Sequence, residues 1–217
     1  MKAPRSTVKR RGPQAAERTR NAVLQAAVEE FAERGLAGAR VDKIARRAGV
    51  NKQALYYHYG NKDALFQAAL EFGYVQFQPH LREWTARGAL PTVAMRELVG
   101  LIFDHVHAHH KHSILISDEN RYRGKHLTRE FRTRVRKAVA PMLGAIGATL
   151  ERGQRGRAFS RAVTPVQLHL TIIGMSMFYF TNAHTLSAIY GRDLTATGAI
   201  SVRRRHVIEF VLSALRP

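Results

Sequence analysis

The 217-residue chain contains no cysteine. This absence excludes disulfide bonds, thiolate metal sites and cysteine nucleophiles, and it agrees with a reducing compartment such as the cytoplasm. Acidic residues are scarce as well, because 16 Asp and Glu stand against 35 Lys and Arg, and the formal net charge is +19. A balance this basic points to nucleic acid or an anionic membrane surface as the partner.

Long apolar runs are also missing. The most apolar region, residues 168–180, is interrupted by His169, Thr171 and Ser176, and it is shorter than the roughly 20 residues of a membrane span. The basic stretch MKAPRSTVKRRGPQ at residues 1–14 is not followed by the apolar segment of a secretory signal. We therefore predict a soluble, cytoplasmic protein that does not associate with a membrane.

Strand patterns are absent, whereas apolar residues recur at helical spacing along most of the chain. The sequence predicts an all-α protein in which residues 1–14 form a flexible basic arm. The expected helices span residues 15–34, 41–48, 52–59, 62–77, 91–110, 126–152, 164–189 and 201–215. Gly35 suits a helix C-cap, Pro79 should kink or end the fourth helix, and Pro141 should kink or divide the helix 126–152.

The most informative segment is VDKIARRAGVNKQALYYHY at residues 41–59. Ala45 is small where two helices cross, Gly49 tolerates the left-handed turn, and Asn51 can cap the second helix. Apolar residues that would close the core between the helices are Ile44, Val50 and Leu55. Outward residues suited to base edges and phosphates are Lys52, Gln53, Tyr56, Tyr57 and His58. The segment therefore predicts a helix-turn-helix, although two helices of an ordinary bundle would share part of this pattern.

The segment continues into Lys62-Asp63-Ala64-Leu65, and the whole string closely resembles the signature of the tetracycline-repressor (TetR) family. The resemblance implies a three-helix DNA-binding domain at residues 15–61 and an all-α ligand-binding and dimerisation domain at residues 62–217. It further implies a homodimer on palindromic, double-stranded operator DNA. Most family members repress, and a small-molecule effector releases them by moving helix four.

Carried over by position, Lys52 and Gln53 fall where the family reads bases. Family positions that contact phosphates hold Tyr56, His58 and Lys62, and Tyr57 matches either role. Two departures stand out: Gln53-Ala54 replaces the common Gly-Thr, and Ala39-Arg40 replaces the usual hydroxyl cap, which brings Arg40 toward the DNA backbone. The arm residues Lys9, Arg10 and Arg11 either enter the minor groove or belong to a solubilising tail.

The C-terminal part is less specific. Residues 118–127 (DENRYRGKHL) loosely resemble the pyrimidine-utilisation repressor subgroup, but this likeness carries no ligand with it. Our candidates for the effector pocket are Phe72, Trp84, Phe103, His107, Phe178 and Asn182. Their mixture of rings and polar groups predicts an amphipathic or aromatic effector of unknown identity.

A histidine cluster follows, with His105, His109 and His112 on one helical face and His107 and His110 on another. Imidazoles at this spacing could bind zinc or nickel, with Asp104 and Asp118 as possible extra ligands. A partly exposed helix end explains the same pattern, and we favour it; we therefore predict no bound metal and no cofactor.

Two other classes of function compete with the regulator. A metal enzyme would use the histidine cluster, but the chain offers no paired carboxylates, nucleophile–base arrangement or Gly-rich phosphate loop, so we predict no enzyme. A packaging protein that coats any nucleic acid would explain the charge of +19.

The last predicted helix carries an apolar stripe that a monomer would leave partly exposed. Its members are Val207, Ile208, Val211, Leu212 and Leu215. We predict that two copies of 164–189 and 201–215 form the dimer interface.

Overall fold

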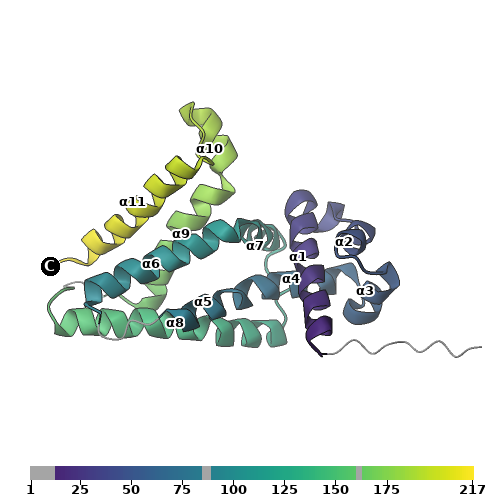
Figure 1. Cartoon of the computed structure of the whole chain (residues 1–217), viewed down its shortest axis with the longest axis horizontal. Coiled ribbons are helices and arrows are strands. Elements are labelled where there is room, and N and C mark those ends of the chain that lie inside the picture. Colours follow the sequence, from purple (N-terminus) through teal and green to yellow (C-terminus); the bar gives the residue numbers. More distant parts are fainter. Residues whose placement is uncertain (1–12, 85–88, 160–162) are drawn as a thin grey trace, which may run out of the picture. The chain divides into compact units, whose positions relative to one another are not determined.

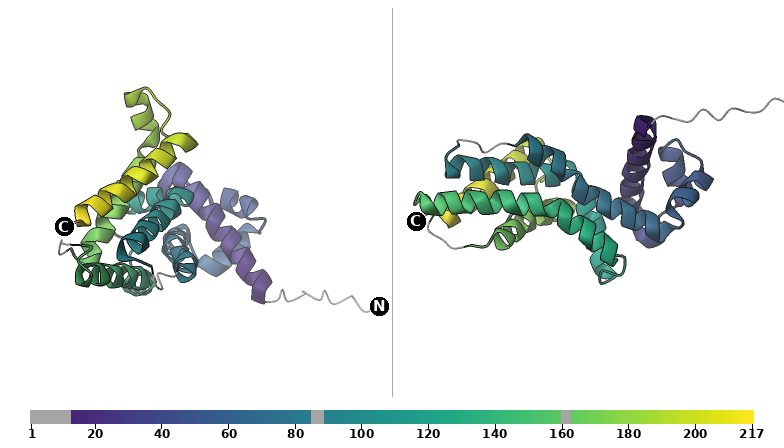
Figure 2. Two further views of the ribbon diagram at one scale, coloured as in Figure 1. Left: turned by 60° about the vertical axis from the view of Figure 1, so that its left-hand side comes forward. Right: turned by 90° about the horizontal axis from the view of Figure 1, so that it is seen from below.

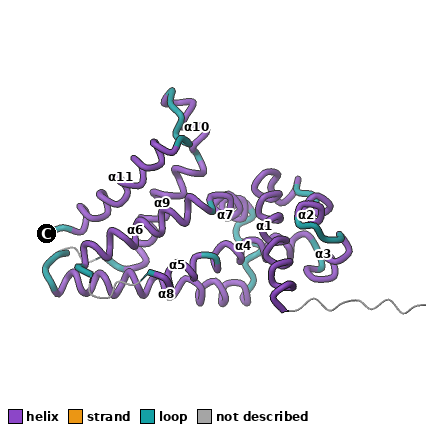
Figure 3. Tube along the Cα trace, viewed as in Figure 1, coloured by secondary structure: helices purple, strands orange, loops and turns teal. Residues whose placement is uncertain are grey.

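The computed structural model describes residues 13–84, 89–159 and 163–217. These residues form helices and loops without a strand, which confirms the all-α class (Figure 3). The helices are α1 (Pro13–Gly38), α2 (Val41–Arg47), α3 (Lys52–Tyr59), α4 (Lys62–Val75), α5 (Phe77–Glu83), α6 (Pro91–Ala108), α7 (His110–Arg121), α8 (Arg129–Arg155), α9 (Pro165–Thr181), α10 (Ala183–Tyr190) and α11 (Thr197–Leu215). None of the helices in these ranges is both long and apolar enough to cross a membrane.

The chain divides into two compact units, Met1–Ala69 and Leu70–Pro217. The division falls inside α4, whereas we placed the domain boundary at the beginning of that helix. Because α4 is unbroken from Lys62 to Val75, one helix carries residues of both units.

In the first unit, α2 packs against α1 and α3 (Figure 1). Phe31 and Phe66 meet edge to face, with ring centroids 5.1 Å apart, and Ile44 and Leu55 are also buried in this unit. Gly35 has a positive φ of 64° and interrupts α1 as predicted, but the chain resumes a helical turn up to Gly38. This turn sets the direction in which the chain enters α2.

In the second unit, α6 packs against α8, α9 and α11, and α8 packs against α9 (Figure 2). The core includes Met95, Leu98, Ile146 and Ile172, each essentially inaccessible to solvent. The stripe of α11 that we assigned to a dimer interface belongs to this core too: Val207, Ile208, Val211, Leu212 and Leu215 are all buried within the chain. The expectation that a monomer leaves this stripe partly exposed was wrong, because α6 and α9 of the same chain already cover it. A dimer interface through residues 164–189 and 201–215 stays a prediction.

Several boundaries differ from the predicted ones. We missed α5 and α7, and the predicted helix 164–189 is divided at Asn182 into α9 and α10. Pro79 is the third residue of α5, where a backbone N–H has no partner within the helix, so the proline fits there without breaking it. Pro141 lies inside α8, which runs as one helix from Arg129 to Arg155.

Candidate DNA-binding and effector sites

The turn between α2 and α3 has the geometry that a helix-turn-helix needs. Gly49 adopts a φ of +66°, and the Val50 amide donates to the Ala45 carbonyl at 3.0 Å. The Asn51 side chain caps α3 by accepting from the Gln53 amide at 2.8 Å. The predicted turn and cap are thereby confirmed, and a β-carbon at position 49 would strain the backbone.

Helix α3 turns a polar and aromatic face to solvent. Lys52, Gln53, Tyr56, Tyr57 and His58 are all exposed, and the side chain of Tyr57 keeps 87% of its accessible surface. The Lys52 ammonium lies 5.9 Å from the centroid of the Tyr56 ring, a cation–π distance that helps to hold the lysine along the helix surface. The face offers hydrogen-bond donors and flat rings, as base edges and phosphates require.

Two basic residues that we assigned to the DNA backbone have partners inside the first unit. The Lys62 ammonium donates to the carbonyls of Ala37 at 3.1 Å and Ala39 at 3.4 Å, where α1 ends. The Arg40 guanidinium binds Asp42 through two hydrogen bonds of 3.3 and 3.1 Å. This hydrogen bond, together with the positive charge, holds the pKa of the Asp42 carboxyl below its usual value.

No hydroxyl side chain caps the start of α2. Arg40 occupies the N-cap position, and its side chain makes no capping hydrogen bond. Its backbone amide instead donates to the Glu30 carboxylate at 3.1 Å. The arm residues Lys9, Arg10 and Arg11 lie outside the described residues.

The second unit contains a cavity of about 280 Å³ between α4, α5, α6, α7, α8 and α9. Most of its lining is apolar, including Phe77, Ile102, Met142 and Ile173. Leu70, Gly73 and Tyr74 of α4 form part of the wall. The helix that follows α3 after two residues therefore reaches the cavity with its C-terminal half.

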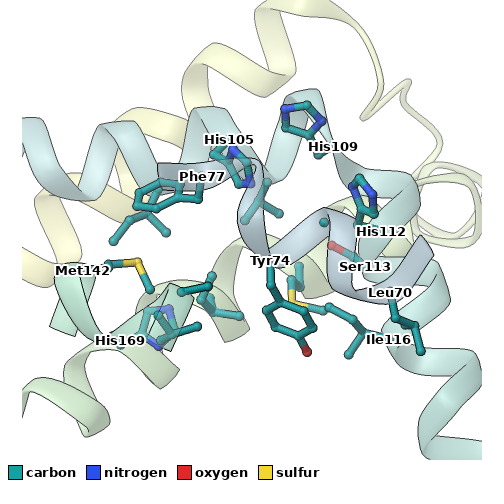
Figure 4. A pocket seen from close by; sticks show the side chains of 17 residues that line it. Leu70, Tyr74, Phe77, His105, His109, His112, Ser113, Ile116, Met142 and His169 are labelled. Carbon is teal, nitrogen blue, oxygen red and sulfur yellow. The ribbon is translucent and has the colours of Figure 1, made fainter. Parts of the chain in front are cut away.

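Imidazoles supply most of the polar groups of the cavity. His105, His109 and His112 follow one another along one side, and His169 lies across from them (Figure 4). His112 packs directly over Gly73: a β-carbon there would lie 2.5 Å from the His112 ring. A glycine at position 73 is thus what lets the ring lie against α4.

Burial lowers the pKa of three of these imidazoles and so favours their neutral form. Burial, followed by the charges of His109, His80 and His112, lowers the pKa of His105 to about 3. The pKa of His109 is lowered by burial and then by His80 and His110, and burial alone lowers the pKa of His169. Among the described residues, His105 Nδ1 and His169 Nε2 are buried without a hydrogen-bond partner, so each ring nitrogen is available to a ligand.

The six residues that we assigned to the effector pocket do not line this cavity. Phe103 is fully buried in the core beside Phe180, with ring centroids 5.3 Å apart, and Trp84 packs half-buried against the same core. Phe72 lies on α4, with its ring centroid 6.0 Å from that of His112, which does line the cavity.

The other three lie at the surface or at a helix end. His107 is exposed and stacks on Phe180 at 5.0 Å, and the side chain of Phe178 keeps 59% of its accessible surface. Asn182 ends α9 and donates to the Phe178 carbonyl at 2.9 Å. The cavity residues that we missed include Tyr74, His169 and Met177.

An exposed, capped helix-turn-helix followed by an all-helical unit with its own cavity defines the class of one-component transcriptional regulators. Residues 23–69 match the model of bacterial regulatory proteins of the tetR family, and residues 91–211 match the tetracyclin repressor-like C-terminal domain. The chain therefore belongs to the tetR family of bacterial regulatory proteins, and it is a DNA-binding transcriptional regulator.

Individual relatives agree with this assignment. The HTH-type transcriptional repressor NicS of Pseudomonas putida is 30% identical over 203 residues, covering 94% of this chain and 95% of NicS. The crystal structure of the putative regulator SCO4942 from Streptomyces coelicolor is 28% identical and matches with a TM-score of 0.58, covering 92% of this chain and 99% of that one. The regulator FadR of Bacillus subtilis, solved with stearoyl-CoA, shares the fold at 19% identity and a TM-score of 0.63, covering 91% and 100% of the two chains.

Proposed function

We propose that the protein is a repressor that leaves its operator when a small molecule occupies the cavity of the second unit. The observation that carries this proposal is the course of α4, which begins two residues after α3 and lines the cavity with Leu70, Gly73 and Tyr74. Its relative NicS is named a transcriptional repressor, which supports repression rather than activation. Because operator DNA is the partner, the proposed place of action is the cytoplasm.

The C-terminal half of α4 is tied to the bundle by an ion pair. The Arg134 guanidinium of α8 donates two hydrogen bonds of 2.6 and 2.8 Å to the Glu71 carboxylate of α4. A molecule that enters the cavity and displaces Tyr74 or Gly73 must therefore move α4 against α8 or together with it. Such a ligand shifts the protein between two arrangements only by its difference in affinity for them.

Base recognition is assigned to Lys52 and Gln53, near the N-terminal end of α3, phosphate contact to Tyr56 and His58, and either role to Tyr57. All five are exposed in the structure, as a DNA contact requires. Asn51 acts through its cap, which fixes the start of α3 beside the two base-reading residues. Phosphate contacts fix the register on the duplex, whereas base contacts specify the sequence.

A second copy of the chain is the proposed partner for the remaining apolar surface of α9 and α11. Val166, Leu170 and Phe178 lie at intervals of four and eight along α9, and Val202 and Phe210 are eight apart on α11. Each keeps half or more of its accessible surface within one chain, and a surface of this kind marks an interaction site. A two-fold dimer through this face accounts for the palindromic operator that we expect.

The cavity favours a small, partly apolar effector. At about 280 Å³ it lies just below the range for small-molecule sites, which is roughly 300–1,000 Å³. Neutral imidazoles can either donate or accept a hydrogen bond, depending on the tautomer. This combination suits an aromatic or short amphipathic molecule with one or two polar groups.

The proposal is tested by filling the cavity. Ala138 is buried and lines it, so Ala138→Phe should occupy the space that the effector needs. We expect a variant that binds operator DNA but is no longer released by a compound that releases the unmodified protein. A variant that is still released at the same concentration would place the effector elsewhere.

A further inference from the structure

Three imidazoles meet at the edge of the cavity, although they come from two separate parts of the sequence. His80 lies on α5, whereas His105 lies on α6 and His109 directly follows that helix. One ring nitrogen of each lies within 4.8 Å of the others. The ring centroids of His105 and His109 are 4.5 Å apart, and those of His80 and His105 are 5.9 Å apart.

This spacing is close to that of a metal site. Two imidazole nitrogens on one tetrahedral ion, each about 2.0–2.1 Å from it, lie roughly 3.3 Å from one another. The three nitrogens therefore need to approach by no more than about 1.5 Å, which is within the reach of small side-chain rotations.

The cluster contains a buried ring nitrogen that lacks a hydrogen-bond partner among the described residues. His105 Nδ1 is buried and has no hydrogen-bond partner in the described part of the chain, which is a costly state for a ring nitrogen. Neutral imidazole is the form that donates a lone pair to a metal ion.

The two carboxylates that the sequence offers as extra ligands have other partners. Asp104 accepts two hydrogen bonds of 2.7 and 2.8 Å from Arg204, and Asp118 lies 3.8 Å from Arg121. The donor set of the cluster is thus nitrogen alone, which favours zinc, nickel, cobalt or copper over magnesium or calcium.

We propose that His80, His105 and His109 bind a divalent transition-metal ion of the zinc type at the edge of the effector cavity. His105 and His109 line the cavity, whereas His80 is exposed, so the ion has one side toward the cavity. Three protein ligands leave a coordination position for water or for a donor atom of the cavity's occupant. Only this last role, in effector binding, rests on the proposed function.

The test uses the full chain after removal of metal with a chelator. We expect Co²⁺ to bind as one ion per chain and to develop the visible absorption of a nitrogen-bound, four- or five-coordinate ion, and Zn²⁺ to displace it. His80→Ala and His109→Ala should each weaken Zn²⁺ binding by about tenfold or more. The matched control is His107→Ala, which removes an exposed imidazole near the end of α6. This variant should bind Zn²⁺ as the unmodified chain does.

Two outcomes would overturn the metal site: no Co²⁺ spectrum in the unmodified chain, or unchanged Zn²⁺ affinity in both cluster variants. Thermal melting without metal shows whether the variants fold, and the exposed His80 makes a loss of folding by His80→Ala unexpected. Operator binding is measured in parallel. If the chain binds an operator specifically but has no affinity for metal, only the metal site is refuted. If it binds metal but recognises no operator, only the proposed function is refuted.

Discussion

The Lys62 ammonium at the start of α4 donates to the carbonyl oxygen of Ala37 at 3.1 Å and thereby ties α4 to the end of α1. The carbonyls at the end of a helix lack partners within it and carry partial negative charge, so a lysine there satisfies them and stabilises the helix end. This contact gives Lys62 a structural role in addition to the phosphate contact that its position in the family motif predicts.

Replacing Lys62 by methionine should accordingly lower the stability of the protein in the absence of DNA. We expect a loss of about 1 kcal/mol in the free energy of unfolding, because a charged hydrogen bond is removed and the carbonyls are still partly hydrated. Denaturant unfolding monitored by circular dichroism measures it. If stability is unchanged while binding to every DNA sequence is weaker, Lys62 contacts phosphate and has no role in stabilising the fold.

Lys52→Ala and Gln53→Ala should each weaken binding to the native operator by about 1–3 kcal/mol and relax the preference at particular base pairs. Their stability should not change, because both side chains are exposed. The matched control is Lys125→Ala, which removes an equally exposed positive charge from the second unit. Equal losses on operator and random DNA would mean that α3 is not the recognition helix.

Gly73→Ala should disturb the response to effector more than the binding of DNA. The new methyl group would lie 2.5 Å from the His112 ring, so the ring must move within the cavity, at a cost of about 1–3 kcal/mol. Gly144→Ala is the matched control, because a β-carbon on that helical glycine would meet open space. This variant should raise the free energy of unfolding by about 0.5–1 kcal/mol. Effector titrations of operator-bound protein compare the two, and an identical response would remove His112 from the effector site.

Leu170→Asp and Val202→Asp should give folded monomers that bind the operator poorly, since both side chains lie on the exposed face of α9 and α11. Val93→Asp, at a surface position of α6, serves as the control and should leave the oligomeric state unchanged. Analytical ultracentrifugation distinguishes the outcomes. Dimers that persist in both α9 and α11 variants would place the interface elsewhere.

Deleting residues 2–11 removes five positive charges, at Lys2, Arg5, Lys9, Arg10 and Arg11. If the arm contacts DNA, the deletion weakens operator binding and makes its salt dependence shallower, since fewer counterions are released. An unchanged affinity and salt slope would identify the arm as a tail without a role in DNA binding.

The helix-turn-helix could be predicted because its geometry is local. Ala45, Gly49 and Asn51 each meet a requirement of the turn within a few residues of themselves, and the structure agrees at all three. The cavity depends instead on which side of each helix faces inward, and α9 is apolar on both sides. His169, Ile173 and Met177 line the cavity, whereas Phe178, one residue further, faces solvent.

The histidine cluster could also be predicted only in part from the sequence, because its members lie far apart along the chain. The spacing of His105 and His109 is visible within one helix, but His80 joins them from 25 positions earlier, on a helix that we did not predict. A partner of this kind is set by the packing of α5 against the bundle, which helical periodicity does not encode.

Sequence-specific operator binding through α3 is tested most directly by genome-wide binding followed by footprinting, with the unmodified chain beside Lys52→Ala and Gln53→Ala. We predict a small number of palindromic protected sites for the unmodified chain, with protection that weakens at particular base pairs in the two variants. Uniform coating of DNA by all three proteins, without a preferred site, would contradict this function and favour a packaging protein.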